Sequence, residues 1–239
     1  MKTIGLLGGM SWESSLEYYQ TVNEEVKRQL GGLHSAKCLL YSVDFAEIEE
    51  YQHRGEWQKA TKAMINAAQS LEKGGADFLV ICTNTMHKMA DEIQTAIQIP
   101  ILHIVDATAQ AILAQGIQRI GLLGTRFTME EDFYVNRLQA HGLQVDIPEK
   151  QEREIIHRII YQELVLGKIL PASREAYKAI IERLQKDGAR GVVLGCTEIG
   201  MLVKQSEYTL PVFDTTQIHA LAAVEVALGN KEVSAYLPK

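Results

Sequence analysis

The sequence predicts an α/β protein made of two pseudo-symmetric α/β domains, each with a parallel-type sheet flanked by helices. Short apolar runs alternate with longer stretches of helical periodicity, which is the pattern of βαβ units. The chain also repeats itself, because residues 71–85 align without gaps on residues 184–198. A second match pairs residues 4–8 with residues 120–124. The 239 residues leave room for two domains of ordinary size.

Seven short apolar runs are predicted to be strands, and most lack polar–apolar alternation, as in strands buried on both faces. They span residues 3–7, 37–42, 78–81, 101–103, 119–123, 191–194 and 212–213. Eight segments with a 3.6-residue periodicity are predicted to be helices. They span residues 14–30, 56–73, 88–97, 108–115, 129–139, 152–166, 173–187 and 217–229.

The domain boundary is predicted near Pro100, where a new strand begins, and Pro211 occupies the matching place in the second copy. By the symmetry of the repeat, the helix after Asp106 crosses into the second domain and the helix from Gln217 crosses back. The first domain is therefore expected to contain residues 1–99 plus about 213–239, and the second residues 100–212.

The composition restricts the class of protein. With 46% hydrophobic and 23% charged residues the chain is globular. Its net charge of −6, without a block of like charges, argues against a nucleic-acid partner. The start is too short and glycine-rich for a signal sequence, and no window approaches the roughly 18 apolar residues of a membrane span. We therefore expect a soluble cytoplasmic protein with no membrane partner.

Cysteine and histidine spacing argues against a disulfide framework and a metal site. The three cysteines form an odd set without CxxC spacing, and the seven histidines show no ligand spacing. The glycines at positions 8 and 9 match neither GxGxxG nor the P-loop pattern, so a nucleotide site is the weakest hypothesis.

Four predicted strand ends carry glycine or small polar residues. Because parallel α/β sheets bind ligands at the carboxyl ends of their strands, these ends predict two facing halves of one site. Each cluster by itself is also typical of a helix cap or turn. The four clusters are Gly8-Gly9-Met10-Ser11, Thr83-Asn84-Thr85-Met86-His87, Gly124-Thr125-Arg126-Phe127-Thr128 and Gly195-Cys196-Thr197-Glu198.

Cys196 is the candidate acid/base, and the repeat pairs it with Thr83 rather than with Cys82. Neighbouring residues on a strand point to opposite faces, so only one of residues 82 and 83 faces the site. A helix beginning after Cys196 is expected to lower its thiol pKa towards the range useful for proton transfer. Cys38 and Cys82 fit the alternative of small buried apolar side chains.

The strand-end clusters resemble the aspartate/glutamate racemase family, in particular its aspartate racemase branch, over essentially the whole chain. This resemblance implies two α/β domains with the active site in the interdomain cleft, often in a homodimer. It also implies an amino-acid substrate, no pyridoxal phosphate or other cofactor, and no metal. In the family, two cysteines on opposite sides of Cα exchange its proton. The segments that carry the resemblance are Gly8-Gly9-Met10-Ser11, Asn84-Thr85-Met86-His87 and Gly195-Cys196-Thr197-Glu198-Ile199.

The sequence departs from the family pattern at Thr83, where a cysteine is usual. A threonine hydroxyl is a far poorer base than a thiolate near neutral pH, so the two directions should be unequal. The resemblance places Cys196 on the side that deprotonates the L-enantiomer. We therefore expect a racemase of aspartate- or glutamate-like substrates that favours the L-enantiomer.

The resemblance also implies which residues bind the substrate. Met10 and Ser11 would contact a substrate carboxylate, whereas Glu198 would orient the ammonium group or the cysteine. The remaining candidates would bind carboxylate or ammonium groups or line the cleft; they are Asn84, Thr85, Thr125, Thr128 and Thr197. The carboxylate-binding arginine and lysine of many aspartate racemases have no clear counterparts, although Arg126 could supply one charge.

Two further classes of protein remain open. Lyases and cis–trans isomerases that use a single cysteine on dicarboxylates share the fold, and the loss of one cysteine fits them. A non-catalytic amino-acid-binding protein would keep the binding residues without turnover. Substrate panels and replacement of Cys196 discriminate among these classes.

Overall fold

The computed structural model describes residues 1–238, which group into two compact units. Unit 1 contains residues 1–107 and 219–237, and unit 2 contains residues 108–218 with Pro238. The chain changes unit inside two helices, α5 (Ile104–Ala114) and α11 (Thr215–Leu228). The boundaries predicted near residues 100 and 213 precede these helices.

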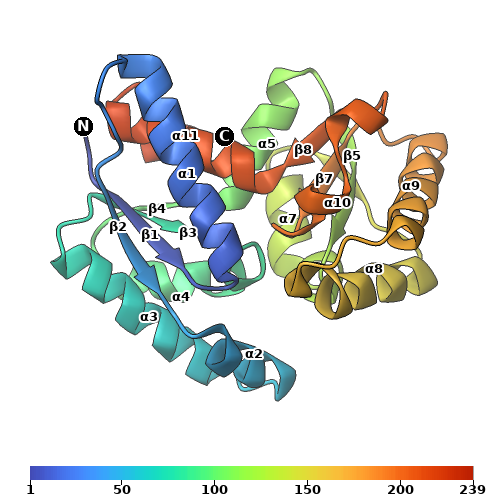
Figure 1. The fold of residues 1–239 in the computed structure, drawn as a ribbon, viewed down its shortest axis with the longest axis horizontal. Coiled ribbons are helices and arrows are strands. Elements are labelled where there is room, and N and C mark those ends of the chain that lie inside the picture. Colours follow the sequence, from blue (N-terminus) through green and yellow to red (C-terminus); the bar gives the residue numbers. More distant parts are fainter. Residues whose placement is uncertain (239) are drawn as a thin grey trace. The chain divides into compact units, whose positions relative to one another are not determined.

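Unit 1 contains a four-stranded parallel sheet with the order β2-β1-β3-β4. Figure 1 shows α1 and α11 on one side of this sheet and α3 and α4 on the other. The strands are β1 (Ile4–Gly8), β2 (Cys38–Ser42), β3 (Phe78–Ile81) and β4 (Ile101–Leu102). The other elements are α1 (Trp12–Leu30), α2 (Phe45–His53), α3 (Trp57–Lys73), η1 (Thr85–Met89), α4 (Ala90–Thr95) and η4 (Val233–Tyr236).

Unit 2 contains a second parallel sheet with the order β6-β5-β7-β8, the same topology in the second copy. Its strands are β5 (Arg119–Gly124), β6 (Gln144–Asp146), β7 (Val192–Gly195) and β8 (Val212–Asp214). Its further elements are α6 (Arg126–Glu130), α7 (Asp132–Ala140), α8 (Lys150–Gln162), η2 (Leu164–Leu166), α9 (Pro171–Lys186), α10 (Ile199–Leu202) and η3 (Gln205–Glu207). The predicted fold class is confirmed.

Strand pairing supports the duplication residue by residue. In unit 1, Leu7 of β1 lies opposite Ile81 of β3, and in unit 2 Leu123 lies opposite Leu194. These are the counterparts that the two sequence offsets predict, and the offsets come from different segments. The register therefore places residues 83 and 196 at equivalent positions, each two residues beyond a matched pair.

In unit 1 the central strands β1 and β3 and the short edge strand β4 are fully buried, but the edge strand β2 is not. β1 and β3 are buried along their whole length, whereas β2 is partly or fully exposed. The expectation that strands are buried on both faces is therefore wrong for β2. β2 has a neighbouring strand on one side only, and its side chains are only partly covered.

Other differences from the predicted elements are local. The helix predicted over residues 152–166 ends at Gln162, because Glu163 leaves helical geometry with φ −128° and ψ −65°. The helix predicted over residues 88–97 spans only Ala90–Thr95, because residues 88 and 89 belong to the 3₁₀ turn η1. β6 and α2 were not predicted: β6 has only three residues, and α2 has a short, weakly patterned apolar face.

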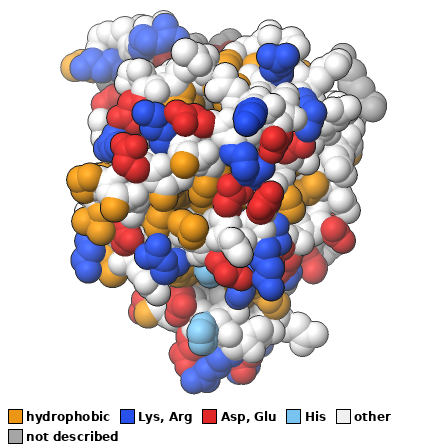
Figure 2. All heavy atoms as spheres, turned by 90° about the vertical axis from the view of Figure 1, so that its right-hand side faces the viewer, with side chains coloured by type: hydrophobic (Ala, Val, Ile, Leu, Met, Phe, Trp, Pro, Cys, Tyr) orange, Lys and Arg blue, Asp and Glu red, His pale blue; other side chains and the backbone are white. Residues whose placement is uncertain are grey.

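None of the helices described for residues 1–238 has the length and apolarity needed to cross a membrane. On the face shown in Figure 2, basic and acidic side chains are interspersed.

Candidate functional site

The first cluster in unit 1 is the turn between β1 and α1. Gly9 has φ +95°, and a Cβ added there would lie 2.3 Å from the carbonyl oxygen of Val43, so the turn requires glycine. Its amide donates to Oγ of Ser15 at 2.7 Å. Ser11 follows as the N-cap of α1 and accepts from the Ser14 amide. Met10, joined to Ser11 by a cis peptide bond, is buried beside them.

The second cluster in unit 1 follows β3, the direct neighbour of β1 in the sheet. Thr83 is 8% exposed, and Asn84 and Thr85 are also buried. Cys82 is completely buried, its thiol donates to the Val80 carbonyl at 3.7 Å, and burial raises its pKa. An inaccessible thiol with a raised pKa is a poor base, which agrees with the choice of Thr83 over Cys82.

The backbone at Thr83 is held by a neutral histidine. His87 Nδ1 lies 2.8 Å from the Thr83 carbonyl oxygen, and the Ile104 amide donates to His87 Nε2 at 3.1 Å. Since a carbonyl only accepts, Nδ1 carries the proton and Nε2 does not. The His87 ring also packs at a tilt of 60° against His103 and lies edge-on to His219, whose pKa burial lowers to about 4. This packing fixes the end of β3 on the first turn of α5.

The third cluster, in unit 2, follows β5. Thr125 is the N-cap of α6 and accepts from the Thr128 amide at 3.3 Å, and the two hydroxyls lie 3.1 Å apart. Both threonines are buried. A Cβ on Gly124 would lie 2.9 Å from the Gly195 carbonyl oxygen, so this glycine lets β5 and β7 approach closely at the cluster.

The fourth cluster follows β7 and contains the candidate base. Cys196 Sγ donates to Glu198 Oε2 at 3.0 Å, and Thr197 Oγ1 donates to the same oxygen at 2.7 Å. Burial first, and then the negative charge of Glu198, hold the thiol pKa of Cys196 well above its usual value. The expectation that a helix lowers this pKa is wrong, because α10 has only four residues and a carboxylate lies closer. Cys196 therefore carries its proton in this state.

All ten predicted site residues lie at the carboxyl ends of central strands. Five belong to unit 1 and five to unit 2, and each set surrounds two strands that pair directly. Within residues 1–238, no group of three or more His, Cys, Asp or Glu residues could hold a metal ion.

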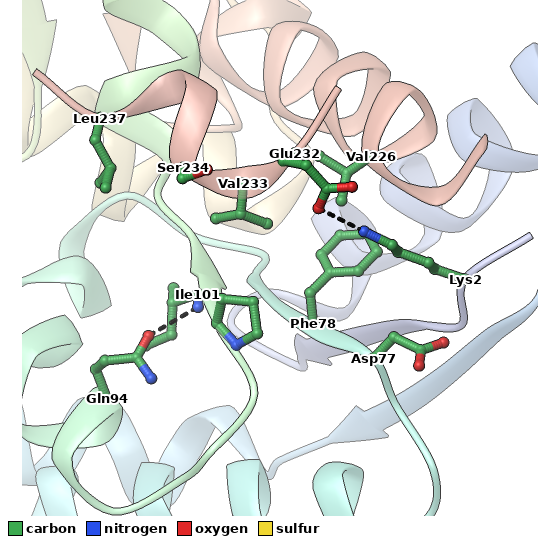
Figure 3. Close-up of a pocket in the computed structure, with 11 residues that line it drawn as sticks. Lys2, Asp77, Phe78, Gln94, Ile101, Val226, Glu232, Val233, Ser234 and Leu237 are labelled. Carbon is green, nitrogen blue, oxygen red and sulfur yellow. Dashed lines mark hydrogen bonds and ion pairs between the residues drawn. The ribbon is translucent and has the colours of Figure 1, made fainter. Parts of the chain in front are cut away.

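A separate pocket of about 320 Å³ lies at the opposite edge of the unit 1 sheet. Figure 3 shows Lys2 and Asp77, which precede β1 and β3, beside Phe78 and Ile101. Two of its polar contacts are internal: Lys2 pairs with Glu232 at 2.7 Å, and the Ile101 amide donates to Gln94. This pocket is distinct from the clusters at the carboxyl ends.

Comparison with known proteins identifies the family. A family model described as Asp/Glu/Hydantoin racemase matches residues 7–223, nearly the whole chain. The chain belongs to this family. The Asp/Glu racemase resemblance, and the isomerase class that it implies, are thereby supported, and every predicted site residue lies within the matched segment.

Similar solved structures and a curated relative are also described as racemases or racemase homologues. A candidate Asp/Glu racemase from Yersinia pestis is 55% identical, with a TM-score of 0.90 over 95% of this chain and all of the other. An aspartate racemase homologue from Pyrococcus horikoshii OT3 is 36% identical, with a TM-score of 0.84 and the same coverage. The broad specificity amino-acid racemase RacX of Bacillus subtilis (strain 168) is 24% identical over 94% of this chain and 98% of its own length.

The sequence did not indicate the residues that hold the strand ends of unit 1 in place through hydrogen bonds. Ser14 Oγ donates to the Cys82 carbonyl at 3.3 Å and so joins the start of α1 to the end of β3. His219 donates from Nε2 to the Leu102 carbonyl and accepts from Tyr18. Neither residue stands in a motif, and only the approach of distant segments shows its role.

Proposed function

We propose that this protein racemises aspartate- or glutamate-like amino acids without a cofactor, with Cys196 as the base and a strong preference for the L-enantiomer. The observation that carries the proposal is the matched strand register. It gives the buried Cys196 thiol of unit 2, which donates to Glu198, the same position in its sheet as the Thr83 hydroxyl has in unit 1. Family membership supports the reaction class.

The chemistry starts from the protonated thiol of Cys196. Glu198 accepts the Sγ proton, and the resulting thiolate removes the proton from Cα of the L-enantiomer. The carbanion is then protonated on its other face by the Thr83 hydroxyl, or by a water that Thr83 holds. Glu198 releases its proton to solvent, and solvent reprotonates Thr83 or the water, which restores the starting state. In the reverse direction Thr83 would have to act as the base, and its hydroxyl has no usable anionic fraction near neutral pH. The α-proton of the D-enantiomer is therefore exchanged slowly.

The other cluster residues would bind the substrate. Ser11 and Met10 stand at a turn whose backbone is shaped by glycine, which suits a carboxylate. Asn84, Thr85 and Thr197 offer amide and hydroxyl groups for the carboxylate or ammonium, and Thr125 and Thr128 line the second half. Aspartate and glutamate are the first substrates to test. The broad specificity of RacX and the hydantoin racemases of the family justify a panel that includes aliphatic amino acids and a substituted hydantoin.

The proposal is tested by exchange of the α-proton in deuterated water. We expect rapid deuterium incorporation from L-aspartate or L-glutamate and at least about tenfold slower incorporation from the D-enantiomer. Mass spectrometry after short incubations measures both rates. Equal exchange from the two enantiomers would contradict the asymmetry, and no exchange from any amino acid would contradict the racemase.

A lyase or cis–trans isomerase of dicarboxylates is the second candidate, because only one of the two matched positions carries a thiol. Incubation with maleate and with L-aspartate, followed by chromatography, separates this activity from racemisation. Ligand binding without any turnover would instead favour a non-catalytic amino-acid-binding protein.

Replacing Glu198 by glutamine should move two measurements in opposite directions. Removing the carboxylate charge lowers the Cys196 thiol pKa, so iodoacetamide should alkylate Cys196 faster near neutral pH. Removing the proton acceptor should lower kcat for L-aspartate by about tenfold or more. Thr197→Val, which removes only the neighbouring hydroxyl, is the matched control. If kcat rises together with alkylation, Glu198 does not accept the proton.

A further inference from the structure

A buried tyrosine hydroxyl lies unsatisfied in unit 2. Tyr177 on α9 is completely buried, and its Oη has no hydrogen-bond partner among the residues that the structure describes. An unsatisfied buried hydroxyl destabilises a fold relative to a paired one, so native proteins rarely keep one without a use. Phenylalanine would fill the same space without that disadvantage.

The surroundings of this hydroxyl connect it to Cys196. Tyr177 belongs to the same core cluster as Cys196, together with Leu164 and Ile199. Cys196 and Glu163 are near enough that their negative charges, after burial, raise the Tyr177 pKa. Tyr177 therefore keeps its proton at neutral pH and has an O–H to donate.

The carboxylate of Glu163, which lies near Tyr177, already has a hydrogen-bond donor and an ion-pair partner. Ser173, one turn before Tyr177 on the same face of α9, donates to Glu163, and Arg158 lies 3.5 Å from that carboxylate. Glu198 is the charged group that accepts from the thiol on its own segment. From the packed elements, Tyr177 shares the core cluster of Cys196, and Glu163 lies near Tyr177. Of these, Tyr177 alone combines a retained proton with an unused hydrogen bond.

We propose that Tyr177 is a positioning residue for Cys196, whose thiolate accepts a hydrogen bond from the Tyr177 hydroxyl once the Sγ proton has passed to Glu198. The role of Cys196 as the base rests on the proposed function, but the place of Tyr177 in the core cluster of Cys196 does not. A hydrogen bond to a buried anion is stronger than one to a neutral thiol, so the contact favours the thiolate. It also holds the Sγ atom of Cys196 in position during proton transfer.

The test is the pH profile of Cys196 alkylation in Tyr177→Phe. Iodoacetamide reacts with the thiolate, and peptide mass spectrometry follows each cysteine separately, so partly exposed Cys38 serves as an internal reference. Removing the donor should raise the midpoint for Cys196 by about one pH unit, which makes alkylation about tenfold slower below the midpoint. Tyr134→Phe, at another completely buried tyrosine of unit 2, is the matched control and should leave the profile unchanged.

The thermal midpoint separates this role from a structural one. Tyr177→Phe should unfold at the same temperature as wild type or higher, because it removes a group without a partner. An unshifted Cys196 profile in the folded variant would overturn the proposal. If the variant does not fold, wild-type protein with ¹³Cζ-labelled tyrosine gives the answer. The Tyr177 resonance should shift as Cys196 loses its proton and should not shift in Cys196→Ala; the same titration in both proteins would overturn the proposal.

Kinetics distinguish this proposal from the proposed function. If wild type exchanges α-protons, Tyr177→Phe should lower kcat for the L-enantiomer by about tenfold with little change in KM, and rates should recover at higher pH. If wild type exchanges no α-proton but the alkylation shift is present, the tyrosine–thiolate contact stands and the racemase proposal fails.

Discussion

Cys196→Ala is expected to abolish turnover while the protein still binds its substrate. General acid–base catalysis by a positioned side chain contributes about 10²–10⁴-fold, and no other thiol can replace this one. Cys82 is completely buried with a raised pKa, and Cys38 lies on edge strand β2. Deuterium incorporation into L-aspartate should therefore fall by at least about 10²-fold. Isothermal calorimetry should give a Kd within a few-fold of wild type.

Cys82→Ala is the matched control, since it removes the same group one residue before Thr83. Its turnover should stay close to that of wild type, although loss of a buried sulfur can lower the thermal midpoint. From the sequence alone, Cys82 could be taken for the catalytic cysteine. The two variants together therefore decide which cysteine is the base. Retained activity in Cys196→Ala, or lost activity in folded Cys82→Ala, would reverse the assignment of the base.

Thr83→Cys is expected to give the enzyme a second base and so to raise activity towards the D-enantiomer. A thiol at position 83 would stand at the structural counterpart of Cys196, two residues beyond the Leu7–Ile81 pair. An ordinary cysteine is a few per cent thiolate at pH 7, whereas a threonine hydroxyl has no usable anion. Exchange from D-aspartate should rise by about 10²-fold, and the ratio of L to D rates should approach one.

The geometry at position 83 favours this substitution. Threonine and cysteine are similar in size, and the backbone there is held by the Thr83 carbonyl and His87 rather than by the side chain. Thr83→Ser, which keeps a hydroxyl, is the matched control and should remain selective for the L-enantiomer. Unchanged D-exchange in a stable Thr83→Cys variant would show that residue 83 does not reach Cα.

Much of the fold was predictable because local patterns repeat. The buried strands β1, β3, β5 and β7 appear as continuous apolar runs, and long helices such as α3 show their periodicity in the sequence. The short edge strand β6 was not predictable, because one apolar residue in three carries no pattern. The break at Glu163 was missed as well, because no glycine or proline stands there.

The sequence by itself determined the duplication, the α/β class and the pairing of Thr83 with Cys196, because alignment offsets and periodicity are properties of the chain order. Only the tertiary structure decided the protonation of Cys196. Its thiol pKa depends on burial and on the carboxylate of Glu198, which accepts from both Cys196 and Thr197. Tyr177 also required the structure, since α9 places it in the same core cluster as Cys196 through packing that no local motif encodes. A sequence pattern shows which groups are present at a strand end, but their proton affinities depend on the side chains that pack around them.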